Sequence, residues 1–585
     1  MIINLIHRPV AGEKKEIFIL QQEMAHELGL KVTLLLQYEL LFEADIVDAV
    51  KQYHQEHGDE IGIWFSDIAS DKMNEIISCK EPFLWLYSRE NKRKIISTVT
   101  AKFKEVFGFD PKVAGAYHVD SYSMGLFKEL CPSIEISIAG CFEEGVKVFH
   151  GCNNSWYLFN EGMPWNPWYP AVENTLRPAE NEEEWTGIVA VPHLARDLAL
   201  SFEGRNDFFA SHPANVQRAM ANEGEAAPYV FNLLDLYRLQ EKYNQGFSYT
   251  NVFVGPGWLK GNPNVQDSDE ITQKLYYEYL KYFVELRSQG RLQDMYMSEF
   301  AQWYKENIPI GTPQVYLAKE ILYGSRKHYF WYSNSNMRIT IDACQGGAIG
   351  DLRPLVAKQP RCTGTDMPNR EIGSNPYLIH SQYRSGNSYH YADGARTTLL
   401  VKHNDVTLDL ANYQSRIESI ETEPDHAVKV ELSPVEIEFP DGLKASIATT
   451  YTIEKDGRIL VGRRILDISD TKAVLEITEY FKGCYGVIEY PEKMDDVILS
   501  VKGKEEASIK FSYDSRRINT IEPQYTSAKI PQIGTEVYME PVTEEFFCGA
   551  AEEGYLFNPY YTLSLTGKIS KEKEAIMCLR LIASK

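Results

Sequence analysis

The first half of the chain alternates short apolar runs with amphipathic segments. Residues 2–6, 32–36 and 61–65 are almost wholly apolar and predict buried strands. Over 14–28 and 91–107, apolar side chains recur every three or four positions, which predicts helices. Such pairs follow one another at intervals of roughly 25–40 residues, the order that gives a parallel sheet with helical crossovers. Seven or eight units favour a barrel, so we expect a distorted α/β (β/α)7-type fold.

The pattern changes beyond residue 333. Apolar and polar positions then alternate in short runs separated by turns such as Pro440-Asp441-Gly442, which predicts a large antiparallel β-sandwich. A stretch rich in glycine, proline and arginine lies between the two patterns. We therefore predict three parts: a catalytic barrel over 1–332, a crossing segment packed on the barrel over 333–396, and a β-sandwich domain over 397–585.

Composition narrows the classes of partner. A chain of 585 residues is too long to fold around a single hydrophobic core, so more than one domain is expected. The net charge of −22 disfavours binding to nucleic acid and to anionic membranes. The nine cysteines form no C-x-x-C pair, and no window has the apolar length of a membrane span or signal peptide, so we expect a cytoplasmic protein without a membrane partner. No dinucleotide or phosphate-binding glycine motif follows a strand, and we expect no cofactor. A homo-oligomer remains an open alternative.

The segment 150–174 carries an unusual number of aromatic rings between three prolines. Because proline removes backbone donors, neither a helix nor a strand is expected there. Two interpretations stay open: the rings pack among themselves, or the loop forms a wall for the apolar face of a sugar ring.

Polar or ionisable side chains follow nearly every predicted strand of the first half. In parallel barrels the carboxyl ends of the strands converge on one face, so these groups are expected to share a pocket. Carboxylates meeting in a pocket can serve glycoside hydrolysis as acid and as base or nucleophile. The carboxylates considered are Asp120, Glu299, Asp197 and Glu161. The predicted substrate-binding residues are His7, Arg8, Trp64, Asp67, His118, Trp165, Asn166, Trp168, His193, Arg196 and Trp258.

A metal site is the rival interpretation of the histidines. His7, His118 and His193 follow three different strands and could gather around an ion with Asp67 or Asp120. However, no H-x-H, H-x-x-x-H or H-E-x-x-H spacing is present. We therefore expect no metal and assign these side chains to substrate contacts.

Three motifs resemble the glycoside hydrolase/deacetylase superfamily with a (β/α)7 barrel: N-L-I-H-R-P at 4–9, L-G-L-K-V-T-L-L-L-Q at 28–37 and G-D-E-I-G-I-W-F at 58–65. The last is similar to G-H-E-I-G-N-H-T of NodB-type polysaccharide deacetylases. Those enzymes bind metal through an aspartate after strand one and two histidines after strand three. Here His7 and Arg8 occupy the first position, and Trp64 and Ile68 the others. Metal-dependent deacetylation is therefore not implied.

The opening L-I-H-R-P also resembles glycoside hydrolase family 57, and family 38 is a further branch, although its zinc motif is missing. Both branches are retaining enzymes with a nucleophilic carboxylate after strand four, where Y-H-V-D-S places Asp120. The resemblance implies Asp120 as nucleophile or base, and we choose Glu299 as its first partner acid, with Asp197 and Glu161 behind it. The resulting hypothesis is an enzyme, a glycoside hydrolase acting on an oligosaccharide or glycoside. A divergent deacetylase or esterase and a non-catalytic carbohydrate-binding protein are the alternatives.

Overall fold

The computed structural model divides the chain into two compact units. The N-terminal unit consists mainly of Met1–Ser201 and Arg205–Thr312, and the C-terminal unit mainly of Pro313–Pro360 and Asn375–Lys585. The structure describes residues 1–66, 69–78, 84, 87–116, 119–138, 165–193, 195, 197–202, 228–260, 269–356, 376–380, 395–423, 426–486, 493–543, 546–555 and 558–583.

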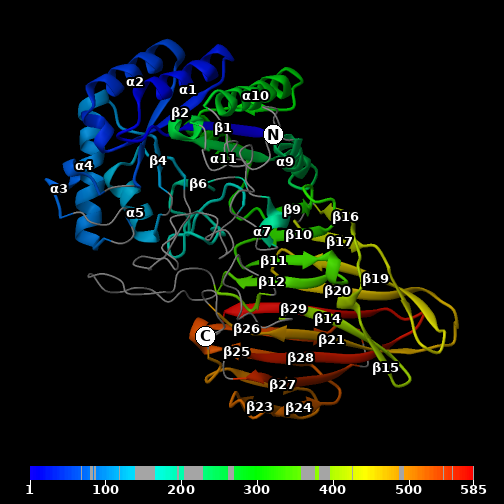
Figure 1. The fold of residues 1–585 in the computed structure, drawn as a ribbon. Helices are drawn as coiled ribbons and strands as arrows, with labels where there is room; N and C mark the ends of the chain where they lie inside the picture. The colour runs from blue at the N-terminus through cyan, green and yellow to red at the C-terminus, as the bar shows by residue number, and fades with distance from the viewer. Residues whose placement is uncertain are drawn as a thin grey trace. The chain divides into compact units, whose positions relative to one another are not determined.

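A parallel sheet that curls into a half-barrel forms the N-terminal unit (Figure 1). Its strand order is β6-β5-β4-β3-β2-β1-β7, and β8 pairs beside β1. The strands are β1 (Ile2–His7), β2 (Val32–Gln37), β3 (Glu60–Trp64), β4 (Val113–Gly115), β5 (Ile136–Ile138), β6 (Val189–Val191), β7 (Tyr249–Val254) and β8 (Gln293–Asp294). The predicted fold class, an α/β barrel-type sheet followed by antiparallel sheets, is confirmed.

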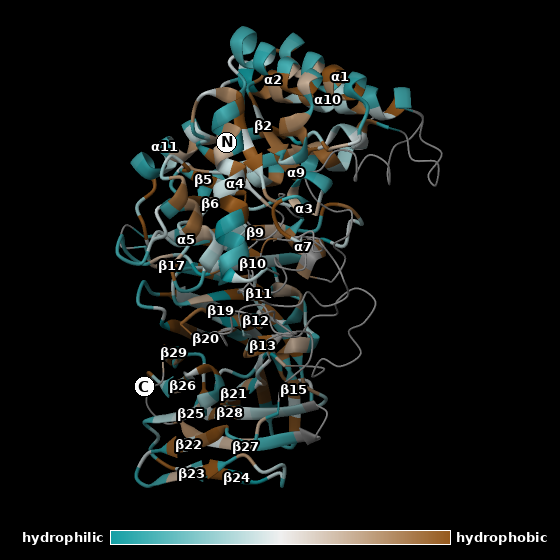
Figure 2. Cartoon of the chain, turned by 90° about the vertical axis from the view of Figure 1, so that its left-hand side faces the viewer, coloured by the Kyte–Doolittle hydropathy of each residue, from teal (hydrophilic) through white to brown (hydrophobic). Residues whose placement is uncertain are grey.

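Helices flank the sheet. They are α1 (Lys15–Glu27), α2 (Ala44–His57), α3 (Asp71–Asn74), α4 (Arg89–Phe107), α5 (Ser121–Leu130), α7 (Leu198–Phe202), α9 (Pro228–Leu239), α10 (Asp269–Ser288) and α11 (Met297–Asn307). The outer turns of α1, α2 and α10 are hydrophilic, while β2 beneath them is hydrophobic (Figure 2). Gly58 and Gly108 end α2 and α4 at φ of 78° and 82°, a left-handed conformation that suits glycine at a helix C-terminus.

The inward faces of the strands form a continuous core. Ile6, Leu35, Trp64, Ile138 and Phe253 belong to one buried cluster that draws on β1 to β7. The alternation of side chains along each strand explains why every second residue reaches this core. The interior is therefore filled with apolar side chains rather than being a pore.

At the amino ends of the strands, α11 closes this core. Its buried residues Met297, Phe300, Ala301 and Tyr304 join the same cluster. The sequence pattern predicts a strand over 295–297, but that prediction is wrong, because β8 ends at Asp294 and pairs only with the first residues of β1. Two residues are too few for the hydrophobic pattern to reveal.

The C-terminal unit contains three antiparallel sheets of five, six and ten strands among its described residues. Its strands are β9 (Gln314–Lys319), β10 (His328–Ser333), β11 (Met337–Asp342), β12 (Ala348–Pro354), β13 (Ile379–His380), β14 (Thr397–His403), β15 (Val406–Asp409), β16 (Ile417–Thr422), β17 (Val428–Leu432), β18 (Val435–Glu438), β19 (Lys444–Ile453), β20 (Ile459–Ile468), β21 (Leu475–Gly483), β22 (Ile498–Lys502), β23 (Glu506–Lys510), β24 (Arg517–Thr520), β25 (Tyr525–Ile530), β26 (Thr535–Pro541), β27 (Phe547–Tyr555), β28 (Asn558–Ile569) and β29 (Ala575–Ala583).

The boundary between the units differs from the one that composition indicates. The compact C-terminal unit begins at Pro313, before the expected limit at residue 332. The described start of the expected crossing segment, residues 333–356, lies in the five-stranded sheet β13-β12-β11-β10-β9. Strands β9 and β10 follow directly after α11. In the sequence their apolar runs look like further strands of the parallel sheet, so the expected boundary falls too late.

Candidate functional site

Arg8, directly after β1, lies at the carboxyl edge of the half-barrel sheet. Its guanidinium carbon is 5.4 Å from the ring centroid of Trp64 and 5.5 Å from that of Phe253. The ring of His193, which follows β6, meets the Phe253 ring edge-on at 4.6 Å between centroids. The Trp64 and Phe253 rings are themselves in contact, with centroids 4.9 Å apart, and the buried Arg8 side chain packs against both. A cation that packs on two adjoining rings has little freedom, so Arg8 is positioned before any ligand arrives.

His7 lies one residue earlier and is completely buried. Its Nε2 is 2.6 Å from the Tyr276 hydroxyl, and the Gln22 side-chain nitrogen is 2.8 Å from its Nδ1. Burial lowers the pKa of His7 to about 3, so the ring is neutral at physiological pH. The His7 ring is thus enclosed between Gln22 of α1 and Tyr276 of α10, and the predicted direct contact with substrate is not open to it.

The loop after β7 brings two glycines to the same edge. A side chain at Gly255 would start 3.7 Å from Arg8 Nη2 and 3.8 Å from Trp258 Cδ1, and one at Gly257 would collide with the Glu13 carboxyl. The sequence Gly-Pro-Gly-Trp thus lets its backbone approach Arg8 and Glu13 closely. Trp258 is 38 % exposed, which leaves part of its ring available at this edge.

Glu13 is a candidate that the sequence analysis missed. It lies in the loop after β1, just before α1, where a glutamate reads as an ordinary helix N-terminal charge. Burial raises the pKa of Glu13, whereas the charges of Arg8 and Lys260 and backbone hydrogen bonds act in the opposite direction. Its Oε2 is buried and has no hydrogen-bond partner among the described residues. This oxygen therefore has unused capacity to accept a hydrogen bond or to bind a proton.

Asp120 follows β4, as expected, but its carboxylate is wholly enclosed. Oδ1 accepts a hydrogen bond from the Ser123 amide at 2.9 Å, and Oδ2 accepts one from the Ser123 hydroxyl at 2.6 Å. Lys92 Nζ, from α4, lies 3.2 Å from Oδ1. The residue therefore caps α5 and neutralises a buried lysine.

Asp197 follows β6 and, like Asp120, accepts a hydrogen bond at the N-terminus of a helix. Its Oδ1 accepts from the Leu200 amide at 3.0 Å, and the Tyr229 hydroxyl donates to Oδ2 at 2.7 Å. It is completely buried, at the start of α7. Asp120 and Asp197 thus both accept hydrogen bonds at helix N-termini.

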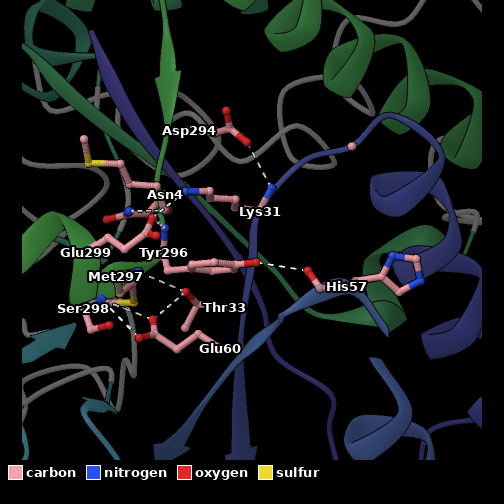
Figure 3. A network of polar contacts seen from close by, with 12 residues as sticks. Asn4, Lys31, Thr33, His57, Glu60, Asp294, Tyr296, Met297, Ser298 and Glu299 are labelled. Carbon is pink, nitrogen blue, oxygen red and sulfur yellow. Dashed lines mark hydrogen bonds and ion pairs between the residues drawn. The ribbon is translucent and has the colours of Figure 1, made fainter. Parts of the chain in front are cut away.

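Glu299 lies at the amino edge of the sheet, opposite the edge that carries Arg8 and Asp120. The expectation that it follows a strand at the carboxyl edge is therefore corrected. It belongs to the first turn of α11 and pairs with Lys31 at 2.7 Å. Figure 3 shows it beside Tyr296 and Lys31, with Glu60 holding the Ser298 amide nearby. Lys31 and Glu60 lie at the amino ends of β2 and β3, so Glu299 is not brought together with Asp120.

The described tryptophans of the predicted sugar-binding surface are mostly inside the fold. Trp64, Trp165 and Trp168 are each 1 % exposed, and Asn166 is also buried. Trp168 donates from its ring nitrogen to the Thr175 carbonyl and pairs through its backbone with Ala190, beside β6. The described part of the aromatic loop therefore packs on the sheet. Asp67, His118, Glu161 and Arg196 lie outside the described residues.

Across the part of the chain that the structure describes, no three histidine, cysteine, aspartate or glutamate side chains are grouped as metal ligands would be. No helix in that part is long and apolar enough to span a membrane. The carboxyl edge of the sheet therefore carries four groups that could contact a ligand. They are the guanidinium of Arg8, the imidazole of His193, the partly buried carboxyl group of Glu13 and the partly exposed indole of Trp258.

No protein-family model matches the chain, and no curated protein matches its sequence. Among solved structures, 4-alpha-glucanotransferase from Thermococcus litoralis is 10% identical, with 99% of each chain covered and a TM-score of 0.31. The alpha-amylase AmyC from Thermotoga maritima is 9% identical over 51% of this chain and 74% of that chain, with a TM-score of 0.27.

A galactose mutarotase-like protein from Clostridium acetobutylicum is 9% identical over 46% of this chain and 99% of its own, with a TM-score of 0.30. All three TM-scores are below 0.5. We therefore base the functional argument on the side chains described above and not on these similarities.

Proposed function

We propose that the N-terminal unit is a carbohydrate-active enzyme, a glycoside hydrolase, that binds a neutral sugar at the carboxyl edge of its half-barrel sheet. The observation that carries the proposal is the grouping of Arg8, Glu13 and Trp258 around the Gly255–Gly257 loop. Parallel α/β sheets bind their ligands outside the carboxyl ends of the strands, and this grouping lies there.

Each side chain has a role that suits a sugar. The Arg8 guanidinium carries N–H donors that suit hydroxyl and ring oxygens, and its packing against the adjoining rings of Trp64 and Phe253 keeps it oriented. The exposed part of the Trp258 ring offers a flat apolar surface for the C–H face of the sugar. His193 lies beside Phe253 and is proposed to bind a further hydroxyl.

Glu13 is proposed as the proton donor to the leaving oxygen. A general acid must stay protonated near neutral pH, and the raised pKa of Glu13 favours that form. The second carboxylate is proposed from Asp120 and Asp197, which follow strands at the same edge. Asp67 and Glu161, which lie outside the described residues, stay candidates on the sequence alone. For Asp120 and Asp197 this role requires release from their helix caps.

The test is an activity screen of the full chain against nitrophenyl glycosides and neutral oligosaccharides. Arg8→Ala and Trp258→Ala should each raise KM about tenfold or more, since each loses a direct sugar contact. Phe109→Ala is the matched control, because Phe109 is 37 % exposed and lies at the amino edge before β4. Activity of both variants equal to that of the control would refute the site.

A second candidate is a carbohydrate-binding unit without catalysis. It is favoured by the complete burial of Asp120 and Asp197, whose carboxylates are held by hydrogen bonds at helix N-termini. Sugar binding that depends on Arg8 and Trp258, without any turnover in the screen, would select it.

A further inference from the structure

The strands β24 and β27 of the C-terminal unit are labelled in Figure 1. The surface over these two strands is hollowed. Three large apolar side chains are more than half exposed there: Ile521, Val542 and Phe547 at 52 %, 53 % and 57 %. They line a hollow of about 670 Å³ with Pro523 and Phe546. Exposed apolar groups gathered at one place mark a binding surface more often than scattered ones do.

A polar hollow of about 460 Å³ adjoins the first, and Ile521 and Phe547 line both. Three neighbouring strands form its floor, where Asn519 pairs with Gly549 and Gly549 with Ser564. A side chain at Gly549 would start 2.7 Å from Asn519 Oδ1 and 2.8 Å from Ser564 Oγ. The glycine thus keeps open a space at which an amide and a hydroxyl converge.

The charge of the polar hollow is balanced. Its charged residues are Lys504 and Glu505, and its other polar side chains are amides and hydroxyls. A balanced lining gives no electrostatic attraction to an anion or a cation. A ligand with apolar C–H faces and neutral hydroxyl edges matches both hollows, and both volumes fall within the roughly 300–1,000 Å³ of small-molecule sites.

We propose that this surface is a carbohydrate-binding site for a neutral oligosaccharide. One sugar ring stacks on Phe547, which lines both hollows, and the hydroxyls of the neighbouring sugar bond to Asn519 and Ser564. The site belongs to the C-terminal unit and does not depend on the function proposed for the N-terminal unit. It would hold the chain on a polymer or a long oligosaccharide.

The test is isothermal titration calorimetry of the full chain with maltohexaose, cellohexaose, xylohexaose and chitohexaose. Phe547→Ala should weaken binding about tenfold or more by removing the stacking surface, and its exposure means that truncation leaves no cavity. Gly549→Val should weaken it as well by filling the polar hollow. Tyr323→Ala is the control, since Tyr323 is an aromatic residue of the same unit with 58 % exposure.

Trp258→Ala separates this site from the one proposed on the N-terminal unit, because it should leave the Phe547-dependent binding unchanged. Failure of all four hexasaccharides to bind at millimolar concentration would overturn the proposal. Equal affinities of Phe547→Ala and Tyr323→Ala would overturn it too. A self-association that Phe547→Ala abolishes, measured by sedimentation, would assign the surface to a second copy of the chain instead.

Discussion

Lys92 and Asp120 form an ion pair at 3.2 Å in which neither side chain has any exposed surface. The pair joins α4 to α5 just beyond the carboxyl end of β4. Ser123 supplies two further hydrogen bonds to the carboxylate. Removing two charges from water is costly, so such a pair is maintained only where each charge compensates the other.

Replacing Lys92 should therefore destabilise the N-terminal unit. Lys92→Met leaves Asp120 charged and buried without its cation, and we expect the free energy of unfolding to fall by about 3–5 kcal/mol. Urea unfolding measures this change. Arg93→Met is the matched control on the same helix, because the Arg93–Glu129 pair is exposed and its loss should be barely measurable. Equal losses for both variants would contradict the interpretation.

A substitution of Asp120 distinguishes a structural role, in the ion pair with Lys92, from a catalytic one. Asp120→Asn keeps the shape of the helix cap and removes the charge. If Asp120 only holds α4 and α5, the folded fraction of this variant should retain activity, whereas a nucleophile or base would lose activity by a large factor. Circular dichroism and turnover, measured on the same sample, distinguish these outcomes.

His7 predicts a loss of stability in mild acid. Its pKa is lowered to about 3 in the folded chain from 6.5, so the unfolded chain binds a proton first as the pH falls. The stability that its neutral form contributes is present above pH 6.5 and is lost progressively between pH 6.5 and 3. Between pH 6.5 and 5 the wild type should lose about 1–2 kcal/mol more than His7→Gln.

Urea unfolding at the two pH values measures this difference. His403→Gln is the control, because His403 is partly exposed and pairs with Asp441 on the surface. A pH dependence that is the same in the wild type and in His7→Gln would show that another group is responsible.

Glu60 should anchor the first turn of α11. Its carboxylate accepts hydrogen bonds from the Ser298 amide at 3.2 Å and from the Thr33 hydroxyl at 2.9 Å. Glu60→Ala leaves these donors without a partner, and the expected loss is about 1–3 kcal/mol in the free energy of unfolding. Glu299→Ala, on the same turn, should lose less because water replaces its exposed ion pair with Lys31.

Glu13 predicts the form of the pH–rate profile if the proposed hydrolysis is correct. A general acid acts in its protonated form, so activity should fall as the pH rises through the raised pKa of Glu13. Glu13→Gln should lower kcat about 100-fold or more and remove this alkaline limb. The loss should be smaller with a nitrophenyl leaving group, which needs less protonation. Glu16→Gln, exposed on α1, is the control and should behave as the wild type does.

Many elements of the N-terminal unit could be predicted from the sequence because they depend on local pattern. The almost wholly apolar runs around Ile6, Leu35 and Ile63 are buried strands in the structure, and the helices α1 and α4 lie close to their expected bounds. Period and length distinguish the two kinds of element without knowledge of the partner.

The candidate site depended on contacts between distant residues, which local pattern does not contain. Glu299 pairs with Lys31, 268 positions away, and this contact places it at the amino edge. Asp120 and Asp197 follow the expected strands, but their burial against Lys92 and Tyr229 becomes visible only when the helices pack.

Glu13, by contrast, was not predicted as a site residue, and the structure places it at the candidate site. Its sequence context is that of a helix start, and only the return of the chain at Gly257 encloses its carboxyl group. The sequence alone determined the order of strands and helices and the change to antiparallel sheets, because hydrophobic periodicity is a local property. The tertiary structure decided which carboxyl groups meet a ligand-accessible edge, because burial and charge pairing arise only when segments far apart in the chain pack together.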